Sequence, residues 1–123
     1  MYQRGIRGAI TVDDNSYDCL RDAVVELIAE IERKNEFSAQ DISHVIFTLT
    51  KDINCVYPAK IAREEFTDWK FVPMMCVQEM EIEQSLAMCL RVLIVINTEL
   101  KQEEIVPVYL KGAKILRKDL NNA

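Results

Sequence analysis

The sequence predicts an α+β fold, in which a mixed β-sheet carries helices packed on it. The predicted elements follow the order β-α-β-α-β-β-β, which indicates a sheet with both parallel and antiparallel neighbours. The stretch 88–97 (MCLRVLIVIN) is apolar on both of its alternating faces, as expected of a central strand that is covered on both sides. With 123 residues, 50% of them hydrophobic, we expect a single domain that spans residues 1–123.

The predicted strands are short runs of alternating or β-branched apolar residues. They cover residues 4–12, 43–50, 69–73, 88–97 and 108–110. The run 69–73 ends in Pro73, which places it at an edge of the sheet, because proline cannot donate to a central ladder. A polar connection at 81–85 leads into the strand 88–97.

Two helices are predicted between the strands. The first spans residues 16–35 and carries one apolar stripe at helical spacing, formed by Leu20, Ala23, Val24, Leu27, Ile28 and Ile31. The second spans residues 57–66, because Pro58 after Tyr57 suits a first helical turn. Short helical turns are expected at 38–41 and 101–104, and a basic segment follows from residue 112.

Composition excludes several classes of function. The net charge is −5 and there is no basic block, so we expect no nucleic-acid partner. The longest apolar run is too short to cross a bilayer, and the first residues lack the apolar core of a signal peptide, so we expect no membrane partner. The four cysteines show neither zinc spacing nor a C-x-x-C pair, which indicates a reduced, cytoplasmic protein without a metal site.

Arg91 is the residue from which a functional site is predicted. It lies on the strand 88–97 and shares a face with Leu93 and Val95, so we expect it to be largely buried. A buried guanidinium is costly unless an anion pairs with it. The partner is therefore either a carboxylate of this protein or a ligand.

The other candidate residues are also mostly cationic. The single histidine, His44, leaves no Ser-His or Cys-His nucleophile. What remains is a set of cations with three polar neighbours: Arg7, Lys60, Arg63, Arg91 and Arg117, with Cys76, Glu79 and Tyr109. Arginine stays charged and binds carboxylates with two parallel hydrogen bonds. The residues alone predict a carboxylate-binding site, which could also be catalytic by stabilising charge without a proton transfer or a covalent step.

Short motifs spread over nearly the whole chain point to a family. They are RGIRGA (4–9), YPAK (57–60), RE (63–64), WKFVP (69–73), CVQEM (76–80), CLRV (89–92), VYL (108–110) and LR (116–117). Each motif is weak alone, but in this order and at this spacing the sequence resembles the monofunctional chorismate mutases of the AroH class. The resemblance implies a homotrimeric pseudo-α/β barrel with active sites in clefts between subunits.

The same resemblance implies an activity. The reaction would be the Claisen rearrangement of chorismate to prephenate, a shikimate-pathway step toward the aromatic amino acids, without a cofactor. The substrate is a dianion, which agrees with several arginines in an acidic protein. The reaction is unimolecular, which agrees with the missing base and nucleophile.

Roles for individual residues follow from the resemblance alone. Arg91 would meet the ether oxygen that becomes negative as the C–O bond breaks, Arg7 and Tyr109 would hold carboxylate, and Glu79 would meet the ring hydroxyl together with the Cys76 region. The remaining expected substrate-binding residues are Tyr57, Ala59, Lys60 and Arg63 as lining, Met74 and Met75 at the pocket floor, and Leu116 and Arg117 in a tail over the ligand.

Two other functions fit parts of this pattern. The same trimeric scaffold could use its arginines to sense a small carboxylate without catalysis. A different reaction on a similar trimeric fold, such as that of the RidA-type imine deaminases, would rest on fold analogy alone. The presence of Arg7, Glu79, Arg91 and Tyr109 together favours the mutase.

Overall fold

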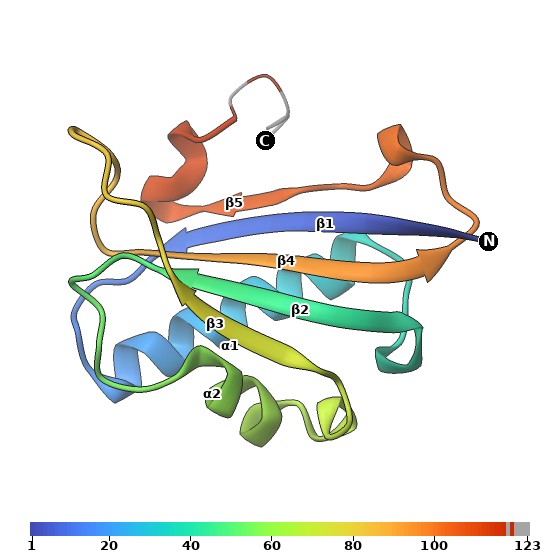
Figure 1. Ribbon diagram of the computed structural model, residues 1–123, viewed down its shortest axis with the longest axis horizontal. Helices are drawn as coiled ribbons and strands as arrows, with labels where there is room; N and C mark the ends of the chain where they lie inside the picture. Colours follow the sequence, from blue (N-terminus) through green and yellow to red (C-terminus); the bar gives the residue numbers. More distant parts are fainter. Residues whose placement is uncertain (118, 120–123) are drawn as a thin grey trace.

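The sheet contains five strands in the order β3-β2-β4-β1-β5 (Figure 1). The computed structural model describes residues 1–117 and Asp119, and its strands are β1 (Tyr2–Thr11), β2 (Ile42–Leu49), β3 (Met74–Gln78), β4 (Cys89–Thr98) and β5 (Val108–Leu110). Strand β4 pairs antiparallel with β1 and β2, whereas β5 runs parallel to β1 and β3 runs parallel to β2. The predicted mixed sheet with a central β4 is therefore confirmed.

Helix α1 (Tyr17–Lys34) follows the predicted pattern closely. It begins after Ser16, whose hydroxyl accepts a hydrogen bond from the Cys19 amide at 3.3 Å, as a helix-capping serine does. All six residues of the predicted apolar stripe are buried. The helix ends at Asn35, whose buried side chain donates to the carbonyls of Ile31 and Val106 and ties the helix end to the segment before β5.

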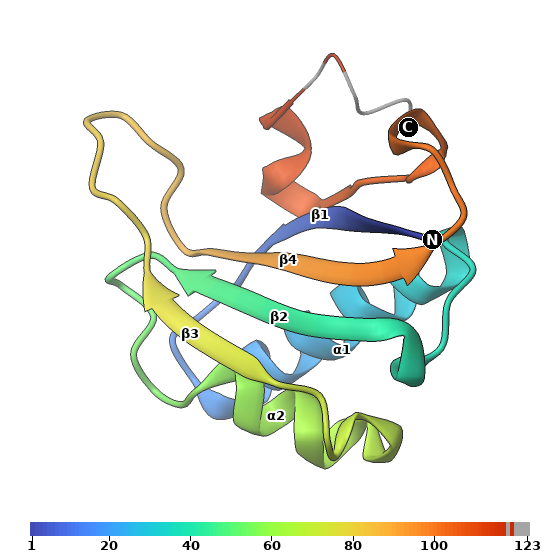
Figure 2. The ribbon, with the colours of Figure 1, turned by 45° about the vertical axis from the view of Figure 1, so that its right-hand side comes forward.

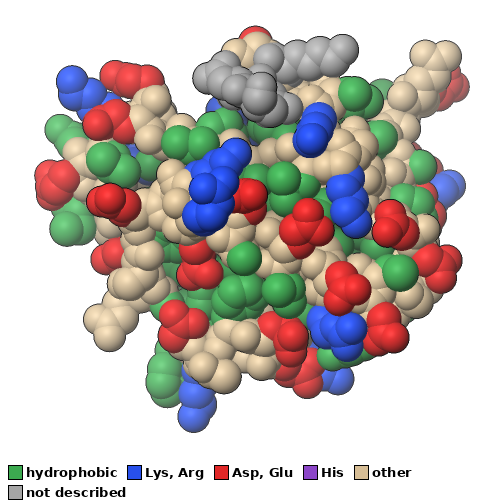
Figure 3. Space-filling model, turned by 180° about the vertical axis from the view of Figure 1, so that it is seen from behind, with side chains coloured by type: hydrophobic (Ala, Val, Ile, Leu, Met, Phe, Trp, Pro, Cys, Tyr) green, Lys and Arg blue, Asp and Glu red, His purple; other side chains and the backbone are tan. Residues whose placement is uncertain are grey.

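Helix α2 (Pro58–Glu65) begins at the proline, as predicted, and buries Ile61 and Ala62 completely. Both α-helices lie on the same face of the sheet, which Figure 2 shows. Alternate residues of β4 point toward them and form the centre of the core, namely Leu90, Val92, Ile94 and Ile96. The side of the molecule that carries the helices presents interspersed positive and negative side chains (Figure 3), as a solvated surface does.

The other face of the sheet, here called the open face, carries no α-helix of the described residues, and only its part near Tyr109 is covered, by Ala113 and Leu116. The side chain of Arg91 is 43% exposed there, and Leu93 on the same face is 36% exposed. The expectation that β4 is covered on both sides, with Arg91 largely buried, is therefore wrong for one chain. The reason is that both α-helices of the described residues are used on the opposite face.

Several strand boundaries also differ from expectation, and two of the differences have a physical reason. Residues 69–73 do not form a strand: Trp69 ends a 3-10 turn, η2 (Thr67–Trp69), and is fully buried beside Phe66. Strand β3 begins at Met74, directly after Pro73. The Pro73 carbonyl still accepts a hydrogen bond of 2.9 Å from the Val45 amide. Because the proline stands before the strand, its missing N–H costs the ladder no hydrogen bond. Strand β4 begins at Cys89, because Met88 has a left-handed φ of 50°. The turns η1 (Ala39–Asp41) and η3 (Gln102–Glu104) match the expected helical turns.

Candidate active site

Strand register places Arg91 and Tyr109 on the open face with a small residue between them. Ala9 of β1 is the Cα partner of both Arg91 on β4 and Tyr109 on β5. Paired residues point to the same side of a sheet, and residues two apart on one strand share a face. Arg7 therefore lies on this face as well, next to Ala9 along β1.

Glu79 reaches Arg91 from the end of β3. Its amide donates to the carbonyl of Leu49 at 2.9 Å, which continues the β2–β3 pairing by one residue. Its Oε2 lies 3.2 Å from Nε of Arg91, with the two side chains 24% and 43% exposed. Of the two partners left open for Arg91, a protein carboxylate or a ligand, the single chain supplies the carboxylate of Glu79.

The contact between these two side chains is an ion pair rather than an aligned hydrogen bond. Within the described residues, Nε of Arg91 is buried and has no hydrogen-bond partner. A buried donor without an acceptor costs roughly 1–3 kcal/mol. Glu79 thus neutralises the guanidinium without an aligned hydrogen bond at Nε, while the Arg91 side chain as a whole is 43% exposed.

Tyr109 lies in a small second core. It is 7% exposed and packs with Ala9, Cys89 and Ala113, and Leu116 covers the same cluster. Ala113 belongs to the 3-10 helix η4 (Lys111–Ile115). This packing brings the predicted tail residue Leu116 to Tyr109.

The start of η4 is fixed to the end of β1. The Gly112 amide donates to the Thr11 hydroxyl at 3.0 Å, and Lys111 Nζ lies 3.5 Å from Asp13. A side chain at position 112 would meet Thr11 at 2.9 Å. The close approach therefore requires a glycine.

Arg117 is paired with Asp119 by two hydrogen bonds, of 3.1 Å from Nε and 3.0 Å from Nη2. The hydrogen bond with Asp119 is the largest cause that raises the pKa of Arg117, and Tyr109 adds to it. The same bond is the largest cause that lowers the pKa of Asp119, and the charge of Arg7 acts in the same direction. Arg7, Tyr109 and Arg117 therefore share one charged neighbourhood.

A second group of predicted residues lies on the face that carries α2. A cavity of about 580 Å³ lies beside β3 and the start of α2, and Tyr57, Lys60 and Cys76 contribute to its lining. Burial raises the pKa of the Cys76 thiol above its usual range, although the Ala59 backbone and the Arg63 charge lower it. The thiol is therefore uncharged near neutral pH, which suits a binding group and not a nucleophile.

The predicted site residues thus divide between the two faces of the sheet. The open-face group consists of Arg7, Met75, Glu79, Arg91, Tyr109, Leu116 and Arg117. The helix-face group consists of Tyr57, Ala59, Lys60, Arg63, Met74 and Cys76. One chain does not bring the two groups together in a single cleft.

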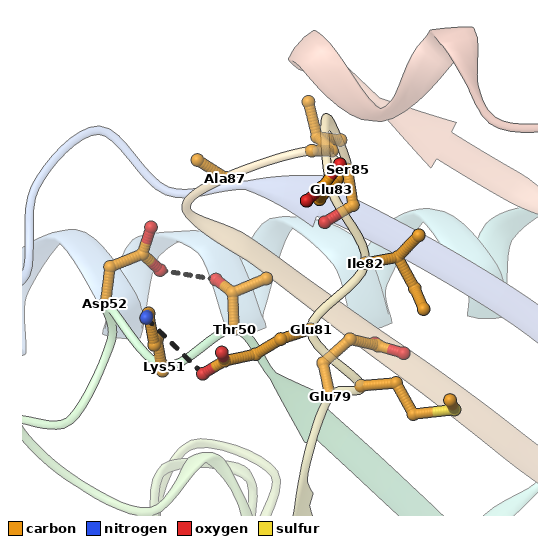
Figure 4. A pocket seen from close by; sticks show the side chains of 11 residues that line it. Thr50, Lys51, Asp52, Glu79, Glu81, Ile82, Glu83, Ser85 and Ala87 are labelled. Atoms are coloured by element: carbon orange, nitrogen blue, oxygen red, sulfur yellow. Dashed lines mark hydrogen bonds and ion pairs between the residues drawn. The ribbon is translucent and has the colours of Figure 1, made fainter.

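A loop from residue 79 to residue 88 overhangs a smaller pocket of about 350 Å³, which Glu79 helps to line (Figure 4). Lys51 Nζ lies 3.4 Å from Glu81, and Asp52 accepts hydrogen bonds from the Thr50 hydroxyl and, at 3.0 Å, from the Met88 amide. The Thr50 hydrogen bond is the largest cause that lowers the pKa of Asp52, and the bond from Met88 adds to it. The segment 50–52 therefore anchors both ends of the loop.

Sequence reasoning does not identify two residues that contact the predicted set, nor the residue that holds the start of β4. Thr48 donates to Glu79, Asp119 pairs with Arg117, and Asp52 holds the start of β4. The contacts of Thr48 and Asp52 join residues more than thirty positions apart. Only the strand register could have predicted them, and hydrophobic periodicity does not fix register between specific strands.

The described residues offer neither a metal site nor a membrane-spanning helix. No group of three or more His, Cys, Asp or Glu side chains is placed to hold a metal ion in this part of the chain. Over the same residues, no helix has both the length and the apolar character needed to cross a bilayer.

Comparison with known proteins gives the family. The family model for chorismate mutase type I matches residues 3–120. The chain belongs to this family. One relative is "Chorismate mutase AroH" from Bacillus subtilis (strain 168), which is 35% identical over 98% of this chain and 94% of the relative. The protein of the same name from Thermus thermophilus is 36% identical over 98% of both chains.

A solved structure agrees with the family assignment. The chorismate mutase from Clostridium thermocellum superimposes with a TM-score of 0.86 at 39% identity, covering 91% of this chain and 98% of that one. The resemblance stated from the sequence motifs and the predicted fold class are confirmed. The family model and these relatives do not favour the two alternative functions, a carboxylate sensor and a RidA-type deaminase.

Proposed function

We propose that this protein is a chorismate mutase, an isomerase that converts chorismate to prephenate. The observation that carries the proposal is the partly exposed Arg91 paired with Glu79 on the open face, in a chain of the chorismate mutase type I family. A preformed donor aimed at a position where charge develops stabilises a transition state more than a ground state.

The rearrangement needs charge stabilisation and a compact substrate conformation. The ether C–O bond breaks while a new C–C bond forms within the same molecule, so no proton is transferred and no covalent intermediate with the protein arises. Arg91 donates to the ether oxygen as negative charge grows on it. The site residues restrict the substrate to the reactive conformation.

The remaining open-face residues bind the rest of the dianion. Arg7 and Tyr109 hold a carboxylate, and Arg117 with Leu116 closes over the ligand. Glu79 accepts a hydrogen bond from the ring hydroxyl, next to the Cys76 region. Their shared charged neighbourhood, seen in the pKa shifts of Arg117 and Asp119, supports this assignment.

The protein acts as a homotrimer, a pseudo-α/β barrel with its active sites between subunits. The open face exposes apolar side chains that an isolated domain would cover, with Met75 63%, Val77 42% and Leu93 36% exposed. In the assembly, the helix-face group of one subunit (Tyr57, Ala59, Lys60, Arg63, Met74 and Cys76) completes the open-face group of the next. The division of the predicted residues between two faces supports this arrangement.

The wider setting is also part of the proposal. Residues 1–123 form one domain, although Lys118 and residues 120–123 lie outside the described residues. The protein is cytoplasmic and needs no cofactor. The net charge of −5 supports a protein without nucleic-acid partners.

The direct test is turnover. Purified protein is mixed with chorismate, the fall in its ultraviolet absorbance is followed, and the product is identified by proton NMR. We expect loss of chorismate well above the uncatalysed rate, with stoichiometric prephenate. Binding of chorismate by calorimetry without any turnover would instead show a carboxylate-binding protein, and would overturn the proposal.

A further inference from the structure

The carboxylate of Glu79 is held by a residue outside the predicted site. Thr48 Oγ1 donates a hydrogen bond of 2.6 Å to Glu79 Oε2. The same oxygen lies 3.2 Å from Nε of Arg91. One oxygen atom of Glu79 therefore contacts both a hydroxyl donor and the guanidinium.

Strand register explains why Thr48 stands at this point. On β2, Thr48 is the Cα partner of Arg91 on β4 and of Val77 on β3. It thus lies between Arg91 and the strand that leads into Glu79, on the open face. Threonine is β-branched, so its side chain has few accessible conformations on a strand, and its hydroxyl is the donor that a carboxylate needs.

The contact distinguishes the two carboxylate oxygens. Oε2 is occupied by Thr48 and faces Arg91, whereas Oε1 has no hydrogen-bond or ion-pair partner among the described residues. A hydrogen bond to a carboxylate is stronger than one between neutral groups. The Thr48 hydroxyl therefore fixes the rotation of the carboxylate and leaves Oε1 free.

We propose that Thr48 is a positioning residue of the mutase site. Its hydroxyl holds Glu79 so that Oε2 faces Arg91 while Oε1 accepts the ring hydroxyl of the substrate. It acts through Glu79 and touches no substrate itself. This inference rests on the proposed function, because the role of Oε1 depends on a hydroxylated substrate.

The first test removes the hydroxyl while keeping the side-chain shape. For Thr48→Val we expect kcat to fall by about 10-fold or more with KM changed by less than about threefold, because ground-state binding of the carboxylates is untouched. Thr48→Ser keeps the donor and should restore most of the activity. The matched control is Thr98→Val, which removes a hydroxyl that accepts from the Leu100 amide at the far end of β4.

A double-mutant cycle tests whether Thr48 acts through Glu79. In a Glu79→Ala background, adding Thr48→Val should cost less than about twofold, because the group to be positioned is already absent. Independent, multiplying losses would overturn the proposal, and so would near wild-type kcat in Thr48→Val. Valine is favoured in strands, so we expect Thr48→Val to fold. If circular dichroism shows that it does not, Thr48→Ala and Thr48→Ser are compared instead. Equal activity of these two variants would overturn the proposal.

The two proposals fail in different ways. Wild-type protein that does not convert chorismate would reject the proposed function. Wild-type protein that converts it, with Thr48→Val and Thr98→Val equally active, would reject only the role of Thr48.

Discussion

Arg91 is paired with Glu79 in an unusual way. Its neighbour Glu79 neutralises the charge, yet Nε has no aligned acceptor in the described part of the chain. A structural ion pair would be expected to align its hydrogen bonds, as arginine–carboxylate pairs usually do. The misaligned pair is the arrangement expected of a side chain that exchanges partners when substrate enters.

Substitution of Arg91 separates a structural role from a catalytic one. For Arg91→Ala we expect kcat to fall by about 100-fold or more, because the developing charge loses its donor. Arg91→Lys keeps the charge but not the guanidinium geometry, so it should also lose most activity, though less completely. Steady-state kinetics with chorismate give both values.

Both Arg91 variants should remain folded. The side chains of Arg91 and Glu79 are 43% and 24% exposed, so the loss of stability should be well below the roughly 3–5 kcal/mol of a fully buried pair. Thermal unfolding checks this, with Arg33→Ala on the exposed end of α1 as the control. A folded Arg91→Ala with near wild-type kcat would remove Arg91 from the mechanism.

At the scale of elements, the loop 79–88 depends on an acidic anchor. Asp52 binds the Met88 amide where β4 begins, and its pKa is lowered in the fold, chiefly by the Thr50 hydroxyl. A depressed carboxylate pKa stabilises the fold above the unfolded value of about 3.9 and loses that effect as the pH falls through the lower folded value. Acid should therefore release this anchor.

Asp52→Asn should reproduce that release at neutral pH. We expect the variant to be less stable than wild type near pH 7, with the difference shrinking as the pH falls from about 4, where the carboxylate of the unfolded chain begins to protonate, through the lower pKa of the folded state. Urea unfolding midpoints at several pH values measure this. Asp14→Asn, in the exposed turn before α1, is the control; a difference that persists unchanged into acid would contradict the assignment.

Removal of the C-terminal tail should leave the 3-10 helix η4 in place. Ala113 is fully buried within η4, so the chain should end after Ile115 rather than at Gly112. We expect this truncated protein to fold, with KM raised about 10-fold or more and kcat changed less, because the proposed role of Arg117 and Leu116 is substrate capture. A second truncation after Arg117 restores both residues and should recover KM; equal kinetics in the two truncations would remove the tail from the site.

Elements with strong local signals were predicted well, and those set by tertiary contacts were not. The apolar stripe of α1 and the proline at the start of α2 are signals within the helix itself, and both helices form as expected. Residues 69–73 have the composition of a strand, but burial of Trp69 beside Phe66 holds them in a turn. From the sequence, the open face of β4 was predicted to be buried, because residues such as Leu93 and Val95 are apolar. In the single chain, Leu93 is instead 36% exposed.

For the candidate site as well, contacts that depend on the tertiary structure could not be predicted from the sequence. Family motifs indicated most of the expected residues, including the neighbours Glu79 and Arg91. They did not indicate Thr48, because its position opposite Arg91 depends on the pairing of β2 with β4. Sequence patterns also could not show that the expected residues lie on two faces of the sheet.

The trimer is the prediction for the whole molecule. Native mass spectrometry at micromolar concentration should give the mass of three chains. Leu93→Glu places a charge on the apolar open face and should shift the protein toward monomers with loss of activity, since burying an unpaired charge at an interface is costly. Phe71→Glu, at a side chain that is 88% exposed beyond η2, is the control. A fully active wild-type monomer would contradict shared sites.

The pairing of β1 also has a consequence for how the protein is made. Strand β1 opens the chain, but its partners are β4 and β5, and Tyr2 pairs with Thr98. A ribosome that adds about 5–20 residues per second needs roughly 5–20 s to synthesise the chain between them. During that time the apolar residues of β1 can pack against α1 but have no strand to pair with, so the sheet can close around β1 only after β4 has been made.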